Sequence, residues 1–367
     1  MSEPQEDFSQ FGGTVELFNQ WRSPRFGERN PTRLDNPVWE WLIGTRHSAY
    51  TAAQVIGAPS PFEAGPGWCF VRFGQSCTDL PDGRKVYIAG EHEDYYDPDF
   101  YIYNDVVVES PDGAISIYGY PRKVFPPTDF HSATLVGSEI VLIGNLGYPD
   151  DRKPGATQVL SLDINSFSVS RRVTAGDMPG WIHDHQAVLS EDGQSILVTG
   201  GKIDRGPGDF LLENLDDWRL NLKSGTWEHT THRNWPRWAI FRSDKQPNYL
   251  WQIRQALWNL EVGWQGKYAE DLSERKDALG KSPDVRAVEE LYRPPIPHTL
   301  LPEREDEYSV YRIQVEGTIV RYVEEHVGIQ ITVEGDLPEA TVHQLVEDAR
   351  SKLSALENIE CHAAQLA

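Results

Sequence analysis

The sequence predicts a mainly β chain built from repeated four-stranded units, followed by a smaller mixed region at its C-terminal end. The first observation behind this prediction is a module that recurs three times, with apolar runs ending at Gly90, Gly144 and Gly200, which are 54 and 56 residues apart. The second is a recurring pair of tight turns that contain glycine, as at Asp192-Gly193 and Ser224-Gly225. A period of this length is typical of a stacked or radial array of one supersecondary unit.

Each copy of the module divides into four short strands, most clearly in the third copy. Asp-Gly and Ser-Gly between apolar runs predict hairpins, because glycine adopts the positive φ that such turns require. Four antiparallel strands in each repeat make a propeller blade. The strands expected in the third copy are His185–Leu189, Ser195–Thr199, Trp218–Leu222 and Thr226–His229.

Particular residues also mark the strand ends of each copy. In the third copy His185 opens the first strand, Gly200-Gly201 ends the second, and Trp227 lies in the last. The second copy has His131 and a single glycine, and the first has Gly74 at the position of the histidine. Over residues 66–230 this pattern resembles the kelch-repeat family in a bacterial-like form, with extra N- and C-terminal segments. The resemblance implies a kelch-like β-propeller, in a family whose functions range from protein docking to sugar chemistry.

The number of blades is the open question of this fold prediction. Three blades are recognisable, whereas a closed propeller usually has four to eight. Either further blades have diverged within residues 1–65 or 231–265, or those flanks cover the edges of an open set of blades. Seven of the twelve tryptophans fall between Trp218 and Trp264. Because aromatic side chains dominate cores and interfaces, we favour flanks that pack over the exposed sheet edges.

The region after the repeats changes character. Helices are predicted over 248–264 and 283–291, and the proline-rich segment 293–297 is expected to be a linker. Two strands and a helix that begins after Pro338 should then form a small β-β-α module, which either docks on the propeller or forms a homo-oligomer. The expected divisions are an N-terminal capping segment at 1–65, propeller blades at 66–235, a helical connector and linker at 236–304, and the β-β-α module at 305–367.

Composition excludes several classes of function. A formal net charge of −22 and a pI near 4.9 argue against a nucleic-acid partner, whose phosphates require basic patches. The sequence has no run of eighteen apolar residues, so we expect no membrane span. Three cysteines in no disulfide framework and an acidic, polar N-terminus unlike a secretory signal favour a cytoplasmic location.

The long connections should all lie on one face, because antiparallel strands send successive loops to opposite ends of a blade. Loops of this length on a rigid scaffold commonly carry function. The opposite face should carry only tight turns. The long connections expected on the functional face are 91–101, 119–129, 145–156, 170–184 and 202–214.

Candidate site residues gather on this long-loop face. We expect a partner or ligand to contact the acidic and aromatic loop and the polar residues opposite it. No cofactor is expected, although carboxylates with imidazoles are the ligands of divalent metals, and the alternative is a metal held by His92, Asp94, His131, His183 and His185. The histidines at equivalent repeat positions also fit a structural role between blades. The full candidate set is Glu91, His92, Glu93, Asp94, Tyr95, Tyr96, Asp129, His131, Arg171, Arg172, Trp181, His183 and His185.

Basic pairs occur on the same face of this acidic chain. Arg122-Lys123, Arg152-Lys153 and Arg171-Arg172 could clamp an anionic sugar or a carboxylate, because arginine presents a fork of donors that matches such groups. The alternative is that these pairs neutralise the acidic loop beside them.

Two classes of function follow from this arrangement. The first is a cytoplasmic scaffold that holds a protein partner on the long-loop face. The alternative is an enzyme or binder for a small polar, carbohydrate-like ligand at the same face, and the sequence leaves open whether the chain is an enzyme. A concave site with converging polar groups would favour the ligand, whereas a flat aromatic surface would favour the protein.

Overall fold

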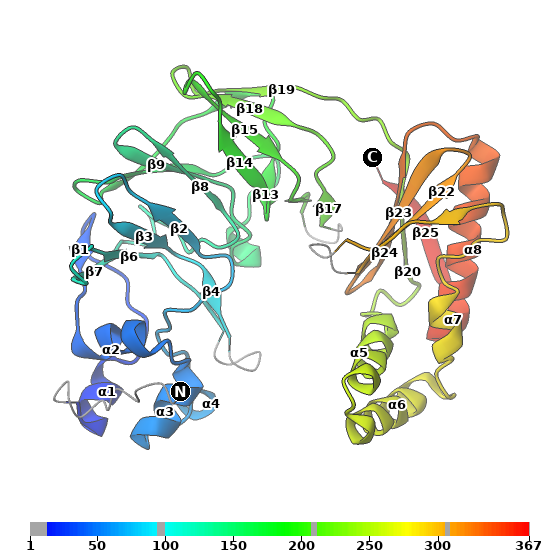
Figure 1. Cartoon of the computed structure of the whole chain (residues 1–367), viewed down its shortest axis with the longest axis horizontal. Coiled ribbons are helices and arrows are strands. Elements are labelled where there is room, and N and C mark those ends of the chain that lie inside the picture. The colour runs from blue at the N-terminus through cyan, green and yellow to red at the C-terminus, as the bar shows by residue number, and fades with distance from the viewer. Residues whose placement is uncertain (1–12, 94–99, 207–210, 305–308, 367) are drawn as a thin grey trace. The chain divides into compact units, whose positions relative to one another are not determined.

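The structure is a computed structural model that describes residues 13–93, 100–206, 211–304 and 309–366. The chain divides into two compact units, unit 1 over Met1–Arg233 and unit 2 over Asn234–Ala367 (Figure 1). Both contain antiparallel sheets, so the prediction of a mainly β chain is confirmed. No helix in the described ranges has both the length and the apolar composition needed to cross a bilayer.

The three copies of the module in unit 1 form one sheet each, antiparallel throughout except for the parallel pair β12–β19 in the third. The first has the order β1-β7-β6-β3-β2, the second β11-β10-β9-β8, and the third β12-β19-β18-β15-β14. The predicted strands of all three copies are therefore present. Their bounds are β2 Ser76–Asp79, β3 Lys85–Ile88, β6 Asp105–Glu109, β7 Ile115–Gly119, β8 Ser132–Val136, β9 Glu139–Ile143, β10 Val159–Asp163, β11 Val169–Arg171, β12 Ala175–Gly176, β14 Gln186–Leu189, β15 Ser195–Thr199, β18 Trp218–Asn221 and β19 Thr226–His229.

Neighbouring sheets pack face to face through their central strands. Ile88 of β3 and Ile140 of β9 are buried in one hydrophobic cluster, while Ile143 of β9 and Ile196 of β15 are buried in the next. Backbone bonds also join the turns before the first strands, since Phe130 N donates to Gly74 O at 3.0 Å and Asp184 N donates to Phe130 O at 2.7 Å. The three sheets therefore form one continuous packed array.

These backbone bonds correct the alignment of the first copy. Gly74, Phe130 and Asp184 are the equivalent residues, and all three have positive φ, at 60°, 48° and 55°. Glycine adopts this conformation without strain, which accounts for its presence in the first copy. Gln75, rather than Gly74, therefore occupies the position of the repeated histidine, one residue before β2.

The long connections contain short ribbons of their own. Part of 91–101 forms β4 Glu91–His92 and β5 Tyr101–Ile102, while β13 Trp181–His183, β16 Lys202–Asp204 and β17 Leu212–Glu213 form a three-stranded sheet. A short 3-10 turn, η2, covers Pro149–Asp151. Such pairing satisfies backbone groups in loops that would otherwise depend on water.

The N-terminal segment packs on the first sheet, as expected of a flank that covers an edge. The short strand β1, Thr32–Arg33, pairs with β7 at the edge of that sheet. Trp39 and Trp68 stack with ring centroids 4.9 Å apart in a core shared with Tyr103 of unit 1. The helices are α1 Val15–Trp21, α2 Pro37–Thr45, α3 Ala49–Ile56 and α4 Pro61–Ala64.

Unit 2 is larger than the β-β-α module expected over 305–367. Its sheet has the order β21-β22-β23-β24-β20-β25. The first strand of the unit, β20 (Arg237–Arg242), therefore lies between β24 and β25, which are the last two strands in the sequence. The helix over Leu250–Glu261, α5, also contributes to the core that α8 covers. The other elements are α6 Gln265–Leu279, α7 Val285–Glu289, β21 Thr299–Leu300, β22 Val310–Val315, β23 Thr318–Glu325, β24 Gly328–Glu334, α8 Glu339–Glu357 and β25 Cys361–Leu366.

A buried charged group explains why residues 236–304 are not a separate connector. Arg242 of β20 contacts Glu357 of α8 at 2.9 Å. The Glu357 carboxylate also accepts hydrogen bonds from the backbone N–H groups of Tyr249 and Leu250 at the start of α5. The Glu357 carboxylate of α8 thus bonds both to β20 and to the start of α5. Unit 2 therefore begins near Asn234 instead of at residue 305.

Candidate functional site

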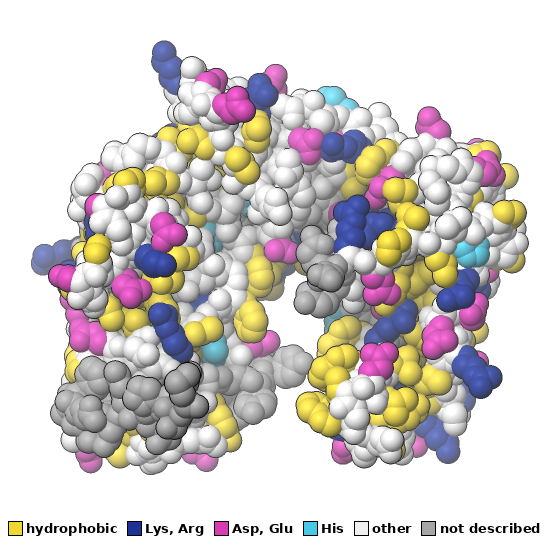
Figure 2. Space-filling view, in the orientation of Figure 1, with side chains coloured by type: hydrophobic (Ala, Val, Ile, Leu, Met, Phe, Trp, Pro, Cys, Tyr) yellow, Lys and Arg dark blue, Asp and Glu magenta, His cyan; other side chains and the backbone are white. Residues whose placement is uncertain are grey.

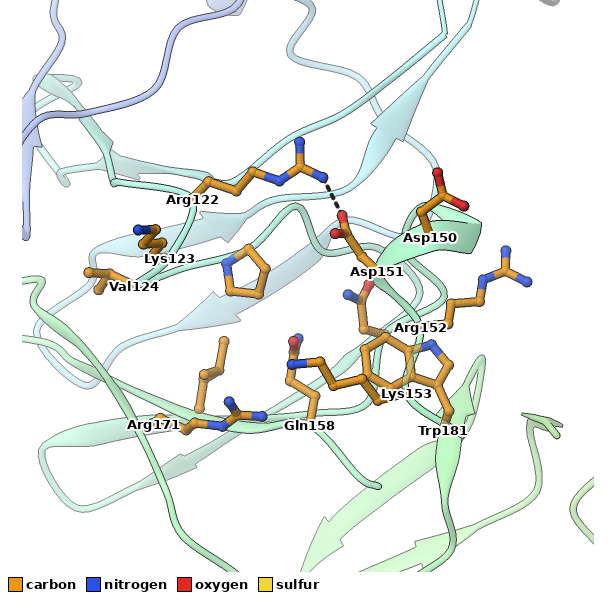
Figure 3. Close-up of a pocket in the computed structure, with 13 residues that line it drawn as sticks. Arg122, Lys123, Val124, Asp150, Asp151, Arg152, Lys153, Gln158, Arg171 and Trp181 are labelled. Carbon is orange, nitrogen blue, oxygen red and sulfur yellow. Dashed lines mark hydrogen bonds and ion pairs between the residues drawn. The ribbon is translucent and has the colours of Figure 1, made fainter. Parts of the chain in front are cut away.

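A cavity of about 560 Å³ lies in unit 1 among the connections that follow β7 and β9 (Figure 3). Its walls come from two of the long connections predicted to carry function, together with β10, the end of β11 and β13. Its lining is Arg122, Lys123, Val124, Pro126, Asn145, Asp150, Asp151, Arg152, Lys153, Gln158, Leu160, Arg171 and Trp181.

Asn145 holds the two connecting loops together. Its Oδ1 accepts from the backbone N–H of Asp129 at 3.0 Å, and its Nδ2 donates to the carbonyl of Pro127 at 3.0 Å. The Asp129 carboxylate adds a third hydrogen bond between the two loops by accepting from the backbone N–H of Gly147 at 2.6 Å. Asp129, a predicted site residue, therefore acts by positioning the loop that carries Arg152 and Lys153.

The cavity lining carries five cations and two carboxylates, a net charge of +3 in a chain whose net charge is −22. Two of the cations are already paired. Arg122 contacts Asp151, and Arg152 contacts Asp204 at 2.8 Å while donating to the carbonyl of Leu146.

Three cations have no ion-pair partner among the described residues: Lys123, Lys153 and Arg171. All three side chains are exposed at the cavity rim. Figure 3 shows Arg171 and Lys153 on the same side of the cavity as Gln158. Unpaired cations held near one another repel, and an anion between them would relieve that repulsion.

The floor of the cavity is fixed and partly apolar. Trp181 is buried, and its Nε1–H donates to the carbonyl of Leu146 at 3.0 Å. Gln158 Nε2 donates to Thr128 Oγ1 at 3.2 Å. Leu160 is buried beside them. A ligand would therefore meet positive charge at the rim and, below it, only the small parts of these two apolar side chains that reach the cavity.

The repeated histidines serve the packing between sheets. A hydrogen bond of 2.8 Å joins His131 Nε2 to Ser76 Oγ of β2, and one of 2.9 Å joins His185 Nε2 to Ser132 Oγ of β8. Burial lowers the pKa of His131 to about 3 and that of His185 to about 4, so both rings are neutral at pH 7. Each histidine thus ties its own sheet to the preceding one.

The ring of His185 also packs closely on the backbone of the second sheet. Gly144 has a φ of 79°, and a Cβ at that position would lie 2.6 Å from His185 Cε1. The glycine that ends each apolar run is therefore required here both by its conformation and by the ring against it.

His183 differs from the two repeated histidines. Its ring is buried, and neither nitrogen has a hydrogen-bond partner among the described residues. Burial, followed by the charges of Lys202 and Arg152, lowers its pKa to about 4. The ring is a neutral core group beside the Arg152–Asp204 pair.

The acidic loop 91–101 is described at its two ends, residues 91–93 and 100–101. Asp94, Tyr95 and Tyr96 lie outside the described residues. Glu91 is partly buried in β4, and burial, then Asp129, then Glu93 raise its pKa to about 7. His92 Nδ1 donates to the carbonyl of Val71 at 2.9 Å, which turns that nitrogen toward the backbone.

Of the five residues proposed as metal ligands, three make other hydrogen bonds, while the buried His183 ring has no hydrogen-bond partner among the described residues. Within residues 13–93, 100–206, 211–304 and 309–366, no cluster of three or more His, Cys, Asp or Glu side chains is arranged to hold a metal ion. His131 and His185 each bond a serine of the neighbouring sheet, His92 bonds the backbone, and Asp94 lies outside the described residues.

The arginine pairs divide between support and site. Arg172 contacts Glu139 and donates to Ser161 Oγ and the carbonyl of Leu222, so its guanidinium is fully engaged beside β10. Arg171, one residue earlier, points to the cavity instead. Of the predicted site residues, the cavity thus contains Arg171 and Trp181, together with cations from the other two basic pairs.

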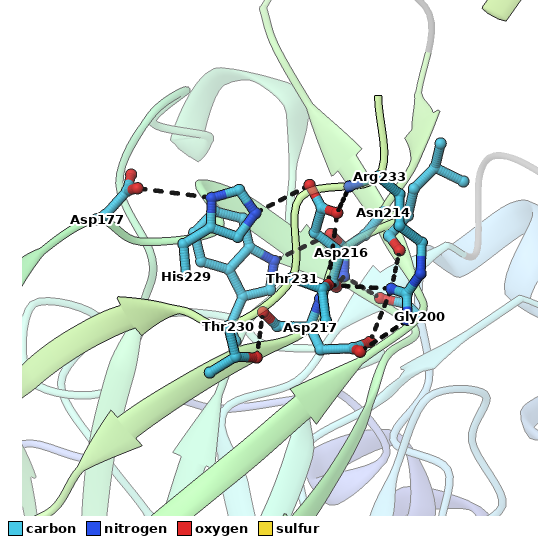
Figure 4. A network of polar contacts seen from close by, with 11 residues as sticks. Asp177, Gly200, Asn214, Asp216, Asp217, His229, Thr230, Thr231 and Arg233 are labelled. Carbon is cyan, nitrogen blue, oxygen red and sulfur yellow. Dashed lines mark hydrogen bonds and ion pairs between the residues drawn. The ribbon is translucent and has the colours of Figure 1, made fainter. Parts of the chain in front are cut away.

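A polar network closes the third sheet and was not anticipated (Figure 4). His229 Nε2 lies 2.9 Å from Asp216 Oδ2, and its ring stacks on Trp218 with centroids 4.0 Å apart. Arg233 Nη2 contacts Asp217 at 2.9 Å. The network ties β19 and the residues after it to the start of β18, where unit 1 ends.

Comparisons with known proteins add little to this geometry. No family model matches the chain, and no curated protein matches it. Among solved structures that match is a novel fungal alcohol oxidase with catalytic diversity among the AA5 family, in complex with copper, which is 14% identical. The match covers 46% of this chain and 45% of that chain, with a TM-score of 0.30. Similarity at this level carries no argument about fold or activity.

Proposed function

We propose that unit 1 is a kelch-type propeller scaffold whose long-loop face binds a small anionic, polar ligand in the basic cavity. The three four-stranded sheets, with equivalent histidine–serine bonds between neighbours, support the scaffold part of the proposal. The N-terminal helices and β1 then serve as the flank that covers the first edge.

One observation carries the ligand part of the proposal: Lys123, Lys153 and Arg171 converge on one cavity without partners among the described residues. Elsewhere in the described chain, arginine side chains such as Arg72 and Arg242 meet carboxylates. In an acidic protein such partners are abundant, so cations left unpaired around a cavity favour an external anion. Carboxylate and phosphate groups suit these donors, because charge-assisted hydrogen bonds are shorter and stronger than neutral ones.

The rest of the cavity favours a ligand of sugar size. Its volume of about 560 Å³ lies within the range of small-molecule sites. The small exposed parts of Trp181 and Leu160 add apolar contacts below the charged rim. A small polar molecule with a carboxylate or phosphate at one end fits both features.

Binding is a better account of this cavity than catalysis. Its described lining contains no serine, threonine, cysteine, histidine or tyrosine, and so none of the usual hydroxyl, thiol or imidazole catalysts. Its two carboxylates differ in use, since Asp151 pairs with Arg122 while Asp150 is exposed.

Calorimetric titration of the full chain tests this function with glucose 6-phosphate, glucuronate and uncharged glucose. We expect the two anions to bind and glucose to bind at least about tenfold more weakly, because one charge-assisted hydrogen bond contributes about 1.5–3 kcal/mol. Lys153→Ala/Arg171→Ala should weaken anion binding by tenfold or more.

The matched control is Arg219→Ala/Lys223→Ala, which removes the same charge from the third sheet and its tight turn. This control should bind the anions as the wild type does. Equal binding of glucose and the anions, or equal losses in both double variants, would contradict the proposal.

Protein docking on the same face is the second candidate function, favoured by one specific observation. Val71 and Phe73 are 54% and 61% exposed beside Glu91 and His92. Large apolar side chains exposed together are common at protein interfaces. Affinity capture with the wild type and with Phe73→Ser should then recover a partner with the first protein only, and identical capture by both would count against docking here.

A further inference from the structure

A groove of about 570 Å³ lies between α5 and α6 of unit 2, and it shares no lining residue with the basic cavity. Figure 2 shows hydrophobic side chains gathered on the surface over these helices. The groove is lined by Trp251, Gln252, Gln255, Trp258, Asn259, Trp264, Lys267, Asp271, Glu274 and Arg275.

Three half-exposed tryptophans dominate this groove. Trp251 and Trp258 are seven residues apart on α5 and so share one face of the helix, while Trp264 immediately precedes α6. They are 49%, 46% and 58% exposed. The ring centroids of Trp258 and Trp264 lie 5.7 Å apart at an interplanar angle of 85°, so the two rings pack edge to face and form one aromatic corner of the groove. Aromatic surface left open to this extent indicates a binding surface.

The charged groups of the groove are already neutralised by one another. Lys267 contacts Asp271 at 2.9 Å, and Asn259 Nδ2 donates to the same carboxylate at 2.7 Å. Arg275 contacts Glu274 at 3.1 Å. Neither a free cation nor a free carboxylate is left to recognise a charged ligand, so the groove complements an uncharged one.

The hydrogen-bonding groups that are still free are mainly donors. None of the three indole N–H groups has a partner among the described residues, and the exposed amide of Gln255 has none either. Indole donates and does not accept. The complementary ligand therefore supplies acceptors and apolar ring faces but few donors of its own.

We propose that the α5–α6 groove binds a proline-rich polypeptide segment in the polyproline II conformation. Proline supplies an apolar ring and a carbonyl acceptor, and it has no backbone N–H. Such segments are extended, have no internal hydrogen bonds, and dock in aromatic-lined grooves. A sugar would bring as many hydroxyl donors as acceptors, and a quaternary ammonium ion would need the negative field that the paired carboxylates no longer supply.

The experiment is a titration of an N-acetylated, C-amidated decaproline peptide into the full chain, followed by tryptophan emission and by the indole N–H resonances in NMR spectra. Three indole resonances should shift saturably. Trp251→Ala/Trp258→Ala should weaken binding by about tenfold or more, because tryptophans are characteristic hot spots. Trp258→Phe keeps an aromatic ring but loses the N–H, and it should weaken binding severalfold with an unchanged melting temperature.

Parallel titrations separate this ligand from others. Lys153→Ala/Arg171→Ala should bind decaproline as the wild type does. Saturation by maltohexaose or tetramethylammonium in place of decaproline would overturn the proposal, as would absence of any response. Self-association that is detected by sedimentation and abolished by Trp258→Phe would assign the groove to a second copy of the chain and would also overturn it. If the double alanine variant unfolds, the wild-type indole resonances and the Trp258→Phe variant still show whether decaproline binds in the groove.

Discussion

The histidines that precede the first strands of the repeats and the cations around the basic cavity both lie in or at the ends of the connections of unit 1, yet their surroundings are opposite. His131 and His185 are buried, neutral and bonded to a serine of the preceding sheet. Lys153 and Arg171 are exposed, charged and unpaired among the described residues. The comparison teaches that these residues, repeated at equivalent positions, support the packing between sheets, whereas the residues that we propose to bind a ligand are ones that the repeat does not require.

Substitutions that remove one side chain from each region should show this contrast most strongly. His185→Ala should lower the free energy of unfolding by about 2–3 kcal/mol, because it leaves a void and removes the partner of Ser132. Lys153→Ala should change it by less than about 0.5 kcal/mol, as exposed substitutions usually do. Urea denaturation of the full chain, followed by near-UV circular dichroism, measures the free energy of unfolding of both variants.

The matched comparison is His131→Ala, which removes the equivalent ring from the second copy. It should lower the free energy of unfolding by a similar amount. If both histidine variants were as stable as Lys153→Ala, the histidines would not be scaffold residues, and the division between the two regions would fail.

A smaller effect on stability should come from Glu91, whose partly buried carboxylate lies near Asp129 and Glu93. Its pKa in the folded chain is about 7, above the ordinary value near 4.5, so the folded state binds this proton more tightly than the unfolded state. The stability linked to that proton is complete below pH 4.5 and is lost as the pH rises through 7. Glu91→Gln, which carries no charge, should therefore be more stable than the wild type above pH 7 and equal to it near pH 4.5.

The size of this difference should be on the order of 1 kcal/mol, since solvent reaches part of the side chain and screens its charge. Thermal melts of both proteins from pH 4.5 to 8 measure it. The control is Glu191→Gln in an exposed tight turn, which should give no such trend. A stability difference that is constant across this pH range would show that Glu91 does not carry a buried charge penalty.

The sheets of unit 1 were predictable because their signals are local. Apolar runs that end at glycine predicted β15 at the bounds that the structure shows, and they placed the equivalent strands β3 and β9 in the other two copies. Unit 2 was harder because its sheet is assembled from distant segments. β20 at 237–242 pairs with β25 at 361–366, and no local pattern indicates which strand lies beside it. The first residues of the sheet therefore looked like part of a connector.

The candidate site was predictable in its location and less so in its members. The long connections and the adjacent basic pairs both indicated the face that holds the cavity. Strand register decides which arginine of the pair faces the cavity. Arg171 lies opposite Leu160 of β10 and lines the cavity, whereas the Arg172 side chain contacts Glu139. Asn145, which positions both loops, has no sequence signal because its role consists of contacts to backbone groups 16 and 18 residues away.

The central claim is that the unpaired cations of unit 1 hold an anion, and the most direct measurement is the position of a heavy anion in crystals of the full chain. Crystals soaked in tungstate, a tetrahedral analogue of phosphate, would reveal it by anomalous scattering. The account predicts a peak in the cavity, with oxygens about 2.7–3.2 Å from Lys153 Nζ and the Arg171 guanidinium. Tungstate bound elsewhere with none in the cavity, or Lys153 and Arg171 paired with the chain's own carboxylates, would contradict it.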